Sequence, residues 1–411
     1  MRGVALGAGM DNELRTAKRN VGILTAAQAI LGSAAPLSIS LGGLAGYQLL
    51  GSDKSLATAP VTGFNLGVAL GAVVVALVTR FIGRKSSFMF GAFCALAGGL
   101  VATLALFNAS FWLFAFGMLL IGLSSGFTQK IRFAAADVSP ATFKAEAISW
   151  ILAGGLVSAI IGPQIAIWMR DLLAPVPFAG AFVALVPLMV LAMVILSFVH
   201  LPRTTGITVM DAAPVRPLLE IIATPRFATG MVCGIGTYAL MTFVMTGAPL
   251  AMVVGCGFSS GEATLGIQWH VIAMFGPSFF TGKLVRRFGA EKVVGAGLVV
   301  LMACAVIAHA GIELWNFWGA LILLGIGWNF GFIGSTAVVA SSYRPQEADK
   351  VQGFHDIVLF GSVALSSFSS GKIFTAFGWS LMNLAIWPVT MVCLGLIVLQ
   401  IIRSKAHSST N

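Results

Sequence analysis

Runs of about twenty apolar residues recur along the whole chain and constrain its fold more than any other feature. Such a run, when helical, is long enough to cross the hydrocarbon core of a bilayer, which is about 30 Å thick. Because a lone strand in lipid leaves its backbone groups unsatisfied, each run is expected to be a helix. The sequence therefore predicts an all-α membrane protein with twelve transmembrane helices, near 20–47, 57–79, 86–107, 111–132, 146–168, 178–200, 227–255, 262–284, 292–311, 315–340, 351–374 and 379–402.

Composition excludes several other classes of protein. The chain is 58% hydrophobic and 9% charged, whereas a soluble domain carries about 25% charged residues. The cysteines and histidines are scattered over separate segments without metal-ligand or paired spacing, so we expect no metal site and no disulfide framework. With no glycine-rich phosphate loop, no catalytic cluster and no channel filter, we expect neither an enzyme, nor a cofactor, nor an ATP-driven pump, nor a channel.

The positive charges follow membrane topology. If the N-terminus is cytoplasmic, 21 of the 24 lysines and arginines lie on cytoplasmic segments, and the exceptions are Lys54, Arg170 and Lys372. Such an excess is typical of cytoplasmic loops. We therefore expect both termini to be cytoplasmic, and the net charge of +10 to reflect orientation rather than nucleic-acid binding.

The chain is expected to consist of two related halves. The longest polar segment divides the twelve candidates six and six, which predicts a six-helix bundle at residues 1–200, a cytoplasmic linker at 201–226 and a second bundle at 227–411. Five residues recur at an offset of 205 or 206 on equivalent loops and helices: Arg80 and Arg286, Gly83 and Gly289, Gly122 and Gly327, Gly126 and Gly331, Pro140 and Pro345. This pattern predicts two parallel repeats around a central cavity.

The basic turns "TRFIGRK" and "RRFGAEK", together with the six-plus-six repeat, resemble the major facilitator superfamily. The family's acidic turn position is occupied here by Arg80 and Arg286. Stretches such as "IRFAAAD", "AISWILAGGLVSAIIGPQ" and "SYRPQEADKVQGFHD" resemble a bacterial branch that includes a riboflavin uptake permease. The resemblance implies a transporter of the bacterial inner membrane that works by alternating access. It also implies import of a small organic nutrient, with a flavin as the best single guess.

Polar and aromatic residues about ten positions from a helix end are expected near the membrane midplane, where such transporters bind substrate. The candidates offer aromatic faces and neutral hydrogen-bonding groups suited to a planar heterocycle. The alternative is that these tryptophans only pack and these amides only join helices. The candidate substrate-binding residues are Gln28, Ser124, Tyr238, Thr242, Gln268, Trp269, His270, Trp328 and Asn329.

A carboxylate inside an apolar run is costly and therefore points to function. Asp356 lies six residues past Lys350, about 9 Å into its helix, where a charge costs on the order of 2.5–3.5 kcal/mol. We expect Asp356 either to couple proton movement or to form an inner-gate ion pair with Arg132, although Arg132 alternatively extends to the interface. His355 is the other candidate coupling or gate residue of this stretch, and because neighbouring residues point about 100° apart on a helix, it cannot point the same way as Asp356.

Two further ion pairs are expected at the cytoplasmic ends of the helices. Arg84 or Lys85 is expected to meet Asp137, and Arg286 or Arg287 to meet Asp349, unless these residues are independent surface charges. We expect a monomer whose partners are the small-molecule substrate, a proton and the lipid bilayer. Proton-driven efflux of drugs or metabolites is the alternative to proton-coupled import, because an aromatic, weakly polar cavity also accepts lipophilic cations.

Overall fold

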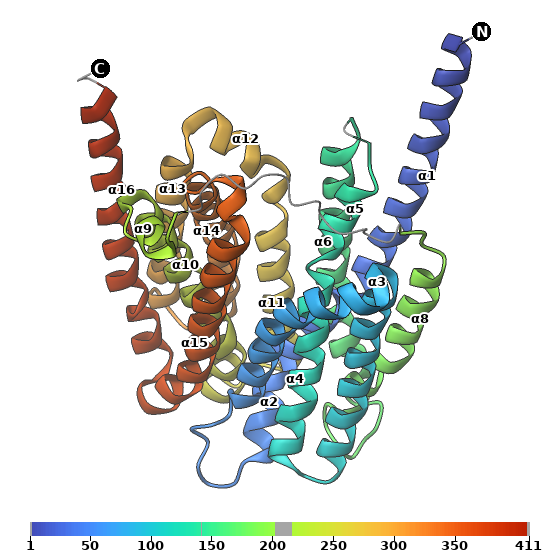
Figure 1. The fold of residues 1–411 in the computed structure, drawn as a ribbon. Helices are drawn as coiled ribbons and strands as arrows, with labels where there is room; N and C mark the ends of the chain where they lie inside the picture. Colours follow the sequence, from blue (N-terminus) through green and yellow to red (C-terminus); the bar gives the residue numbers. More distant parts are fainter. Residues whose placement is uncertain (1, 141, 202–215, 409–411) are drawn as a thin grey trace. The chain divides into compact units, whose positions relative to one another are not determined.

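A computed structural model describes residues 2–140, 142–201 and 216–408, and these are almost entirely helical (Figure 1). The chain divides into two compact units. The first comprises Met1–Leu49 and Gly63–Ile207, and the second comprises Leu50–Thr62 and Thr208–Asn411. Each unit is described by itself below.

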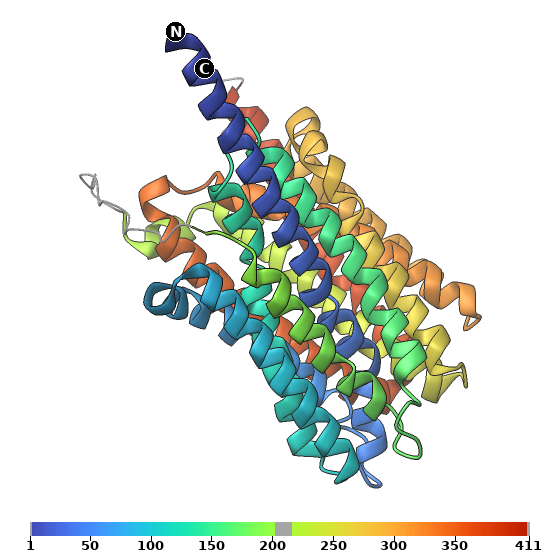
Figure 2. The same cartoon turned by 90° about the vertical axis from the view of Figure 1, so that its right-hand side faces the viewer.

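The first unit is a helical bundle. Figures 1 and 2 show α1 running alongside α6 and α8, in agreement with the contacts between these helices. The helices α1 and α2 are separated by a short turn, as are α4 and α5, so each pair forms one broken membrane segment. The elements are α1 (Arg2–Leu31), α2 (Ala34–Leu49), α3 (Ala59–Phe107), α4 (Phe111–Thr128), α5 (Ile131–Asp137), α6 (Lys144–Met169), α7 (Ala179–Val183) and α8 (Leu185–Ser197).

The second unit is also a helical bundle. Its helix α14 packs against α10, α11 and α13, and α10 also packs against α15 and α16. The short helix α9 contributes the buried Ile221 to an apolar cluster with Phe227 and Val351. The elements are α9 (Leu218–Ile222), α10 (Pro225–Leu250), η1 (Ala251–Gly255), α11 (Ser260–Phe275), α12 (Ser278–Phe288), α13 (Ala290–His309), α14 (Leu314–Ala340), η2 (Pro345–Glu347), α15 (Ala348–Leu384) and α16 (Ile386–Ser408).

The start of α3 is grouped with the second unit. The Thr58 hydroxyl donates a hydrogen bond to the Ser367 carbonyl at 3.0 Å. The Gly371 amide in turn donates to the Thr58 hydroxyl oxygen at 3.1 Å. Two buried hydrogen bonds therefore attach the segment before α3 to the middle of α15.

Glycines shape the tight turns between long helices. Gly83 has φ 80° and ψ 165°, and Gly289 has φ 90° and ψ 149°. Gly378 adopts φ 73° and ψ −176° within α15. Glycine alone reaches this backbone region readily, because it has no Cβ. The matching angles at Gly83 and Gly289 give the 206-residue offset a physical basis, since both basic turns need the same conformation.

The paired glycines of α4 and α14 allow helices to approach closely, but against different neighbours. A Cβ on Gly122 would lie 1.9 Å from the Phe64 carbonyl oxygen of α3. A Cβ on Gly327 would instead lie 2.8 Å from Leu301 of α13, and one on Gly331 would lie 2.7 Å from Thr237 of α10. The paired glycines therefore recur in the sequence, but they do not make equivalent contacts in the two units.

Within the described residues, nine helical stretches are long and apolar enough to cross a membrane. Large apolar side chains of these helices are exposed, as at Val73, Val299 and Val392. In a membrane protein such side chains face lipid. The chain is therefore a multi-pass membrane protein.

Candidate functional site

Four aromatic side chains meet inside the second unit. The Tyr238 ring of α10 lies 5.4 Å from the Trp328 ring and 5.0 Å from the Phe332 ring, both on α14, in edge-to-face contacts. Trp328 and Phe332 stack at 5.2 Å with an interplanar angle of 15°. Phe360 of α15 completes the group at 6.4 Å from Tyr238. We call these four residues the aromatic cluster.

The aromatic cluster combines aromatic rings with a buried polar atom that has no partner in the described residues. Trp328 is 8% exposed, and its indole Nε1 has no hydrogen-bond partner among the described residues. A buried indole N–H normally finds an acceptor. Tyr238 is only half-buried. The structure thus brings together two of the predicted residues, Tyr238 and Trp328, and adds Phe332 and Phe360, which the sequence analysis missed. The spacing of four residues between Trp328 and Phe332 places them on one helix face.

Asn329 lies beside Trp328 but serves a different contact. Its amide Nδ2 donates to the Met274 carbonyl and to the Ser278 hydroxyl, both at 2.6 Å. Its Oδ1 accepts a hydrogen bond from the Thr281 hydroxyl at 2.6 Å. Asn329 is fully buried. These contacts join α14 to α11 and α12, which supports the alternative that Asn329 is a helix-joining amide.

His270 is enclosed between α11 and α14. Its Nδ1 lies 2.7 Å from the Leu321 carbonyl oxygen, and the side chain is fully buried. An N–H at Nδ1 would donate to that carbonyl, which leaves Nε2 as an acceptor. Nε2 has no partner in the part of the chain that the structure describes. The imidazole thus provides one link between helices and one unused acceptor.

The other predicted residues of α10 and α11 point in different directions. Trp269 is 43% exposed, whereas Gln268 is 8% exposed and Thr242 is 1% exposed. Trp269 therefore does not share the enclosed surroundings of His270. Consecutive residues on a helix point about 100° apart, which separates these neighbours.

Gln28 and Ser124 lie in the first unit. Gln28 is half-buried on α1, and its Cβ packs close to Gly154 of α6. Ser124 is 1% exposed on α4. The Gln28 Oε1 and the Ser124 hydroxyl are both buried without hydrogen-bond partners in the described residues. Each is a polar atom inside an apolar bundle, where an unmade hydrogen bond is costly.

One of the two predicted inner ion pairs is present. Arg84 Nη2 lies 2.7 Å from Asp137 Oδ2, which confirms this pairing. The neighbouring Lys85 instead donates to the Ser197 carbonyl of α8. The side chain of Asp349 lies outside the described residues, so its predicted pairing with Arg286 stays a prediction. Arg287 lies over the Phe288 ring at 5.2 Å.

His355 and Asp356 contact each other through their side chains. The His355 Nδ1 lies 3.3 Å from Asp356 Oδ1. The His355 side chain is 10% exposed and that of Asp356 is 45% exposed. Side-chain rotation thus brings together two groups whose Cα–Cβ bonds diverge. The Arg132 guanidinium lies over the Phe133 ring at 4.9 Å, and its predicted pairing with Asp356 stays a prediction.

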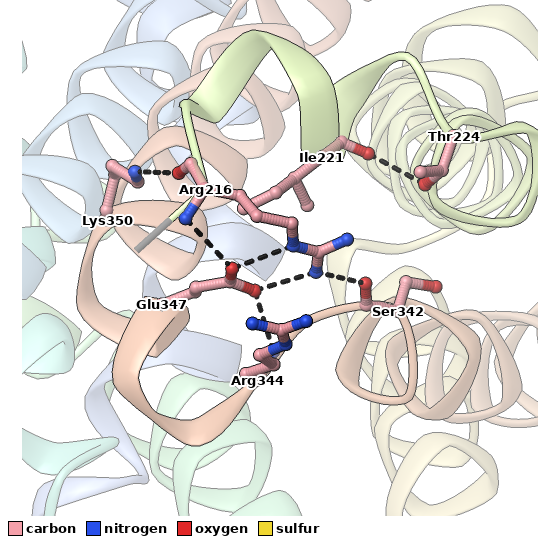
Figure 3. Close-up of polar contacts among 7 residues, drawn as sticks. All are labelled: Arg216, Ile221, Thr224, Ser342, Arg344, Glu347 and Lys350. Carbon is pink, nitrogen blue, oxygen red and sulfur yellow. Dashed lines mark hydrogen bonds and ion pairs between the residues drawn. The ribbon is translucent and has the colours of Figure 1, made fainter. Parts of the chain in front are cut away.

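A buried carboxylate network at the end of the second unit was missed by the sequence analysis (Figure 3). Glu347 is 1% exposed, and its two carboxylate oxygens accept hydrogen bonds from Arg216 Nε and Nη2, both at 2.8 Å. The Arg344 amide donates to the same carboxylate at 2.8 Å. Lys350 Nζ donates to the Arg216 carbonyl at 2.6 Å. This two-pronged contact fixes the chain just before α9 against the connection between α14 and α15.

Comparison with known proteins shows the family of this chain. Residues 21–367 match the family model of the Major Facilitator Superfamily. The chain belongs to the major facilitator superfamily. It is 47% identical over 387 residues to the riboflavin transporter RfnT of Brucella anthropi, covering 94% of this chain and 96% of that protein. It is also 30% identical over 374 residues to the MFS-type transporter YdeG of Bacillus subtilis, covering 87% and 86% of the two chains.

A solved structure supports the same fold. The nucleoside transporter NupG superposes with a TM-score of 0.69 at 12% identity, covering 92% of this chain and 98% of that one. The 47% identity to the riboflavin transporter RfnT confirms the resemblance to a bacterial branch that includes a riboflavin permease. This superfamily member is a membrane transporter and not an enzyme.

The Arg216–Glu347 contact leads to a prediction about pH. The hydrogen bonds from Arg216 and from the Arg344 amide lower the pKa of Glu347 from its ordinary 4.5 to about 2, and Glu347 raises the pKa of Arg216. A lowered carboxyl pKa stabilises the folded state fully above 4.5, and this contribution is lost as the pH falls from 4.5 through about 2. Glu347→Gln should therefore melt several degrees below the wild type at pH 7, and the difference should shrink toward pH 3.

The measurement is the melting temperature of the purified protein at a series of pH values. Glu146→Gln, which removes an exposed carboxylate from α6, is the matched control and should follow the wild type throughout. A Glu347→Gln deficit of equal size at pH 7 and pH 3 would contradict the assignment.

Proposed function

We propose that this chain is a secondary active transporter that imports riboflavin or a closely related heterocycle. The observation that carries the proposal is the 47% identity to a riboflavin transporter over 94% of the chain. Two chains with this level of identity share a common fold, so we expect them to share a substrate class as well. The aromatic cluster supports it chemically, because a planar tricyclic ring system stacks well on aromatic faces.

The topology that goes with this function has twelve crossings. Two of the nine apolar stretches, 59–107 and 350–403, contain the glycine turns at Gly83 and Gly378, so each can cross twice. The helices α11 (16 residues) and α12 (11 residues) together supply one further crossing. That total is twelve, in two six-helix repeats at residues 1–200 and 227–411 joined by a linker at 201–226. The chain would then lie in the bacterial inner membrane with both termini in the cytoplasm.

We infer that the substrate contacts the second unit through the Trp328 indole N–H, the Tyr238 ring and the unused His270 Nε2. Gln28 and Ser124 of the first unit, whose buried polar atoms also have no partner in the described residues, stay proposed substrate-binding residues. Riboflavin carries ring carbonyls, a ring N–H and a hydroxylated side chain, which match such donors and acceptors. Support is weaker for Gln268, Thr242, Trp269 and Asn329. Trp269 is exposed, and the amide of Asn329 already makes its hydrogen bonds to neighbouring helices.

The experiment that tests the proposal is uptake of riboflavin into proteoliposomes containing the purified full chain. We expect saturable uptake that competing flavins inhibit and adenosine does not, together with thermal stabilisation of the detergent-solubilised protein by riboflavin. Imposing an inward proton gradient should increase accumulation. Efflux of lipophilic cations without riboflavin uptake would replace this proposal with the alternative of a drug exporter.

Asp356 is proposed to be the group through which protons drive the transport. Asp356→Asn is expected to retain exchange of riboflavin across the membrane while losing accumulation driven by a proton gradient, because an amide cannot take up and release a proton. Exchange and accumulation are measured with the same proteoliposomes. Loss of both activities would assign Asp356 to an inner-gate contact such as the one predicted with Arg132, and wild-type uptake would remove it from either role.

A further inference from the structure

The first unit contains a cavity that the transport proposal does not use. It has a volume of about 220 Å³ and lies between α3, on both sides of Gly83, and the start of α5. A single water accounts for about 30 Å³ of liquid, so the cavity admits a larger group. Its walls include the cations Arg84 and Lys130. The hydroxyl residue Thr79 and the apolar residues Val75, Phe88 and Phe133 also line it.

The surroundings of the cavity are strongly positive. The segments 79–88 and 129–137 carry five cations, Arg80, Arg84, Lys85, Lys130 and Arg132, against the one carboxylate of Asp137. Asp137 is engaged by Arg84 at 2.7 Å. Lys130 Nζ, which also lies 5.8 Å from the centre of the Phe133 ring, therefore has no carboxylate on these two segments left to neutralise it. An anion entering the cavity would meet a net positive potential.

The outer surface next to the cavity is apolar and exposed. The exposed fractions are 51% for Phe133, 82% for Phe81 and 48% for Ile82. Phe81 and Ile82 immediately precede Gly83, and the hydrogen bond from the Thr79 hydroxyl to the Ser87 hydroxyl at 3.0 Å spans this turn. Exposed aromatic and aliphatic side chains beside lysine and arginine are typical of a lipid headgroup boundary. A site for a freely soluble anion does not need such a border.

We propose that this cavity binds the phosphate group of an anionic phospholipid, with Lys130 and Arg84 facing the phosphate and with Phe133 and Phe81 beside the acyl chains. Basic pockets between membrane helices recognise anionic headgroups in this way. Inorganic phosphate shares the ionic chemistry but not the apolar contacts, so the acyl chains account for the exposed phenylalanines. The inference concerns a lipid site separate from the aromatic cluster and does not depend on the transported substrate.

The test is retention of lipid by the purified full chain, measured by native mass spectrometry after exchange into detergent with equal amounts of phosphatidylglycerol and phosphatidylcholine. The wild type should retain phosphatidylglycerol preferentially. Lys130→Gln should bind it about fivefold more weakly, the effect expected for one cation near an anionic lipid. Lys130→Arg should keep the preference, which shows that charge at this position and not a folding defect is responsible.

The matched control is Lys283→Gln, which removes an exposed lysine beside the basic turn of the second unit. It should retain phosphatidylglycerol as the wild type does. Equal losses in the Lys130→Gln and Lys283→Gln variants would overturn the proposal, because they would indicate a diffuse effect of surface charge. If the wild type showed no preference for phosphatidylglycerol but bound millimolar inorganic phosphate, the proposal would be overturned in favour of a soluble anion.

Discussion

Gly67→Ala is expected to prevent the first unit from packing, and little folded protein should be recovered. A Cβ at this position would lie 2.1 Å from the Leu119 carbonyl oxygen and 2.7 Å from the Leu123 amide nitrogen of α4. Real side chains do not approach backbone atoms this closely, and backbone atoms cannot move aside as the end of a side chain can. The helices α3 and α4 must therefore separate along their contact.

The cost of this separation spreads beyond one residue. Gly63 and Gly71 share the face of Gly67, and added Cβ atoms there would lie 2.8 Å from the Ala115 carbonyl oxygen and 2.3 Å from the Leu123 carbonyl oxygen. Small residues at this spacing let membrane helices approach closely, where dispersion contacts provide much of their association. Forcing extra atoms into a packed contact costs about 1–3 kcal/mol and occasionally more, and two backbones in contact leave little room for relief.

Gly155→Ala is the matched control for Gly67→Ala. Gly155 also lies in a helix interior, in α6, but a Cβ there meets nothing within 4 Å. Alanine should stabilise this helix by about 0.5–1 kcal/mol relative to glycine. The measurements are the yield of the monodisperse peak in size-exclusion chromatography and the melting temperature. Similar melting temperatures for the two variants would show that α3 and α4 lie farther apart than these distances imply.

The basic glycine turns were accessible from the sequence because they depend on local chemistry. The backbone angles at Gly83 and Gly289 lie where only glycine is comfortable, so the same residue must recur at both turns. The Arg84–Asp137 pair followed from the same logic, since both ends of a helical hairpin meet at one membrane surface. The Arg216–Glu347 pair did not, because its partners are 131 residues apart and neither belongs to an apolar run.

The depth of a residue in a membrane helix follows from counting, but its direction does not. Each residue adds about 1.5 Å along the axis and turns by about 100°. Counting from the helix ends therefore predicted the central level of both Trp328 and Asn329. Only the neighbouring helices determine that Trp328 faces Tyr238 on α10 while Asn329 faces Ser278 on α12. For the same reason Trp269 and His270 share a level but not an environment.

For the proposed transport of riboflavin, Trp328→Ala is expected to weaken riboflavin binding by roughly five- to 150-fold, since stacking of a heterocyclic base on an aromatic side chain contributes about 1–3 kcal/mol. The ring is held in place by Phe332, stacked at 5.2 Å, and by the edge of Tyr238. Protein contacts therefore order the ring before substrate arrives, so binding does not have to supply the free energy of ordering it.

Two further variants separate stacking, hydrogen bonding and packing at Trp328. Trp328→Phe keeps an aromatic face and loses the indole N–H, so it should bind better than Trp328→Ala but below the wild type if the N–H donates to a flavin carbonyl. Trp315→Ala, on the same helix and 62% exposed, should bind as the wild type does. Binding is measured by quenching of riboflavin fluorescence, and uptake in proteoliposomes should fall in the same order. Wild-type affinity in Trp328→Ala, with a lowered melting temperature, would make Trp328 a packing residue and would place the flavin elsewhere in the transporter.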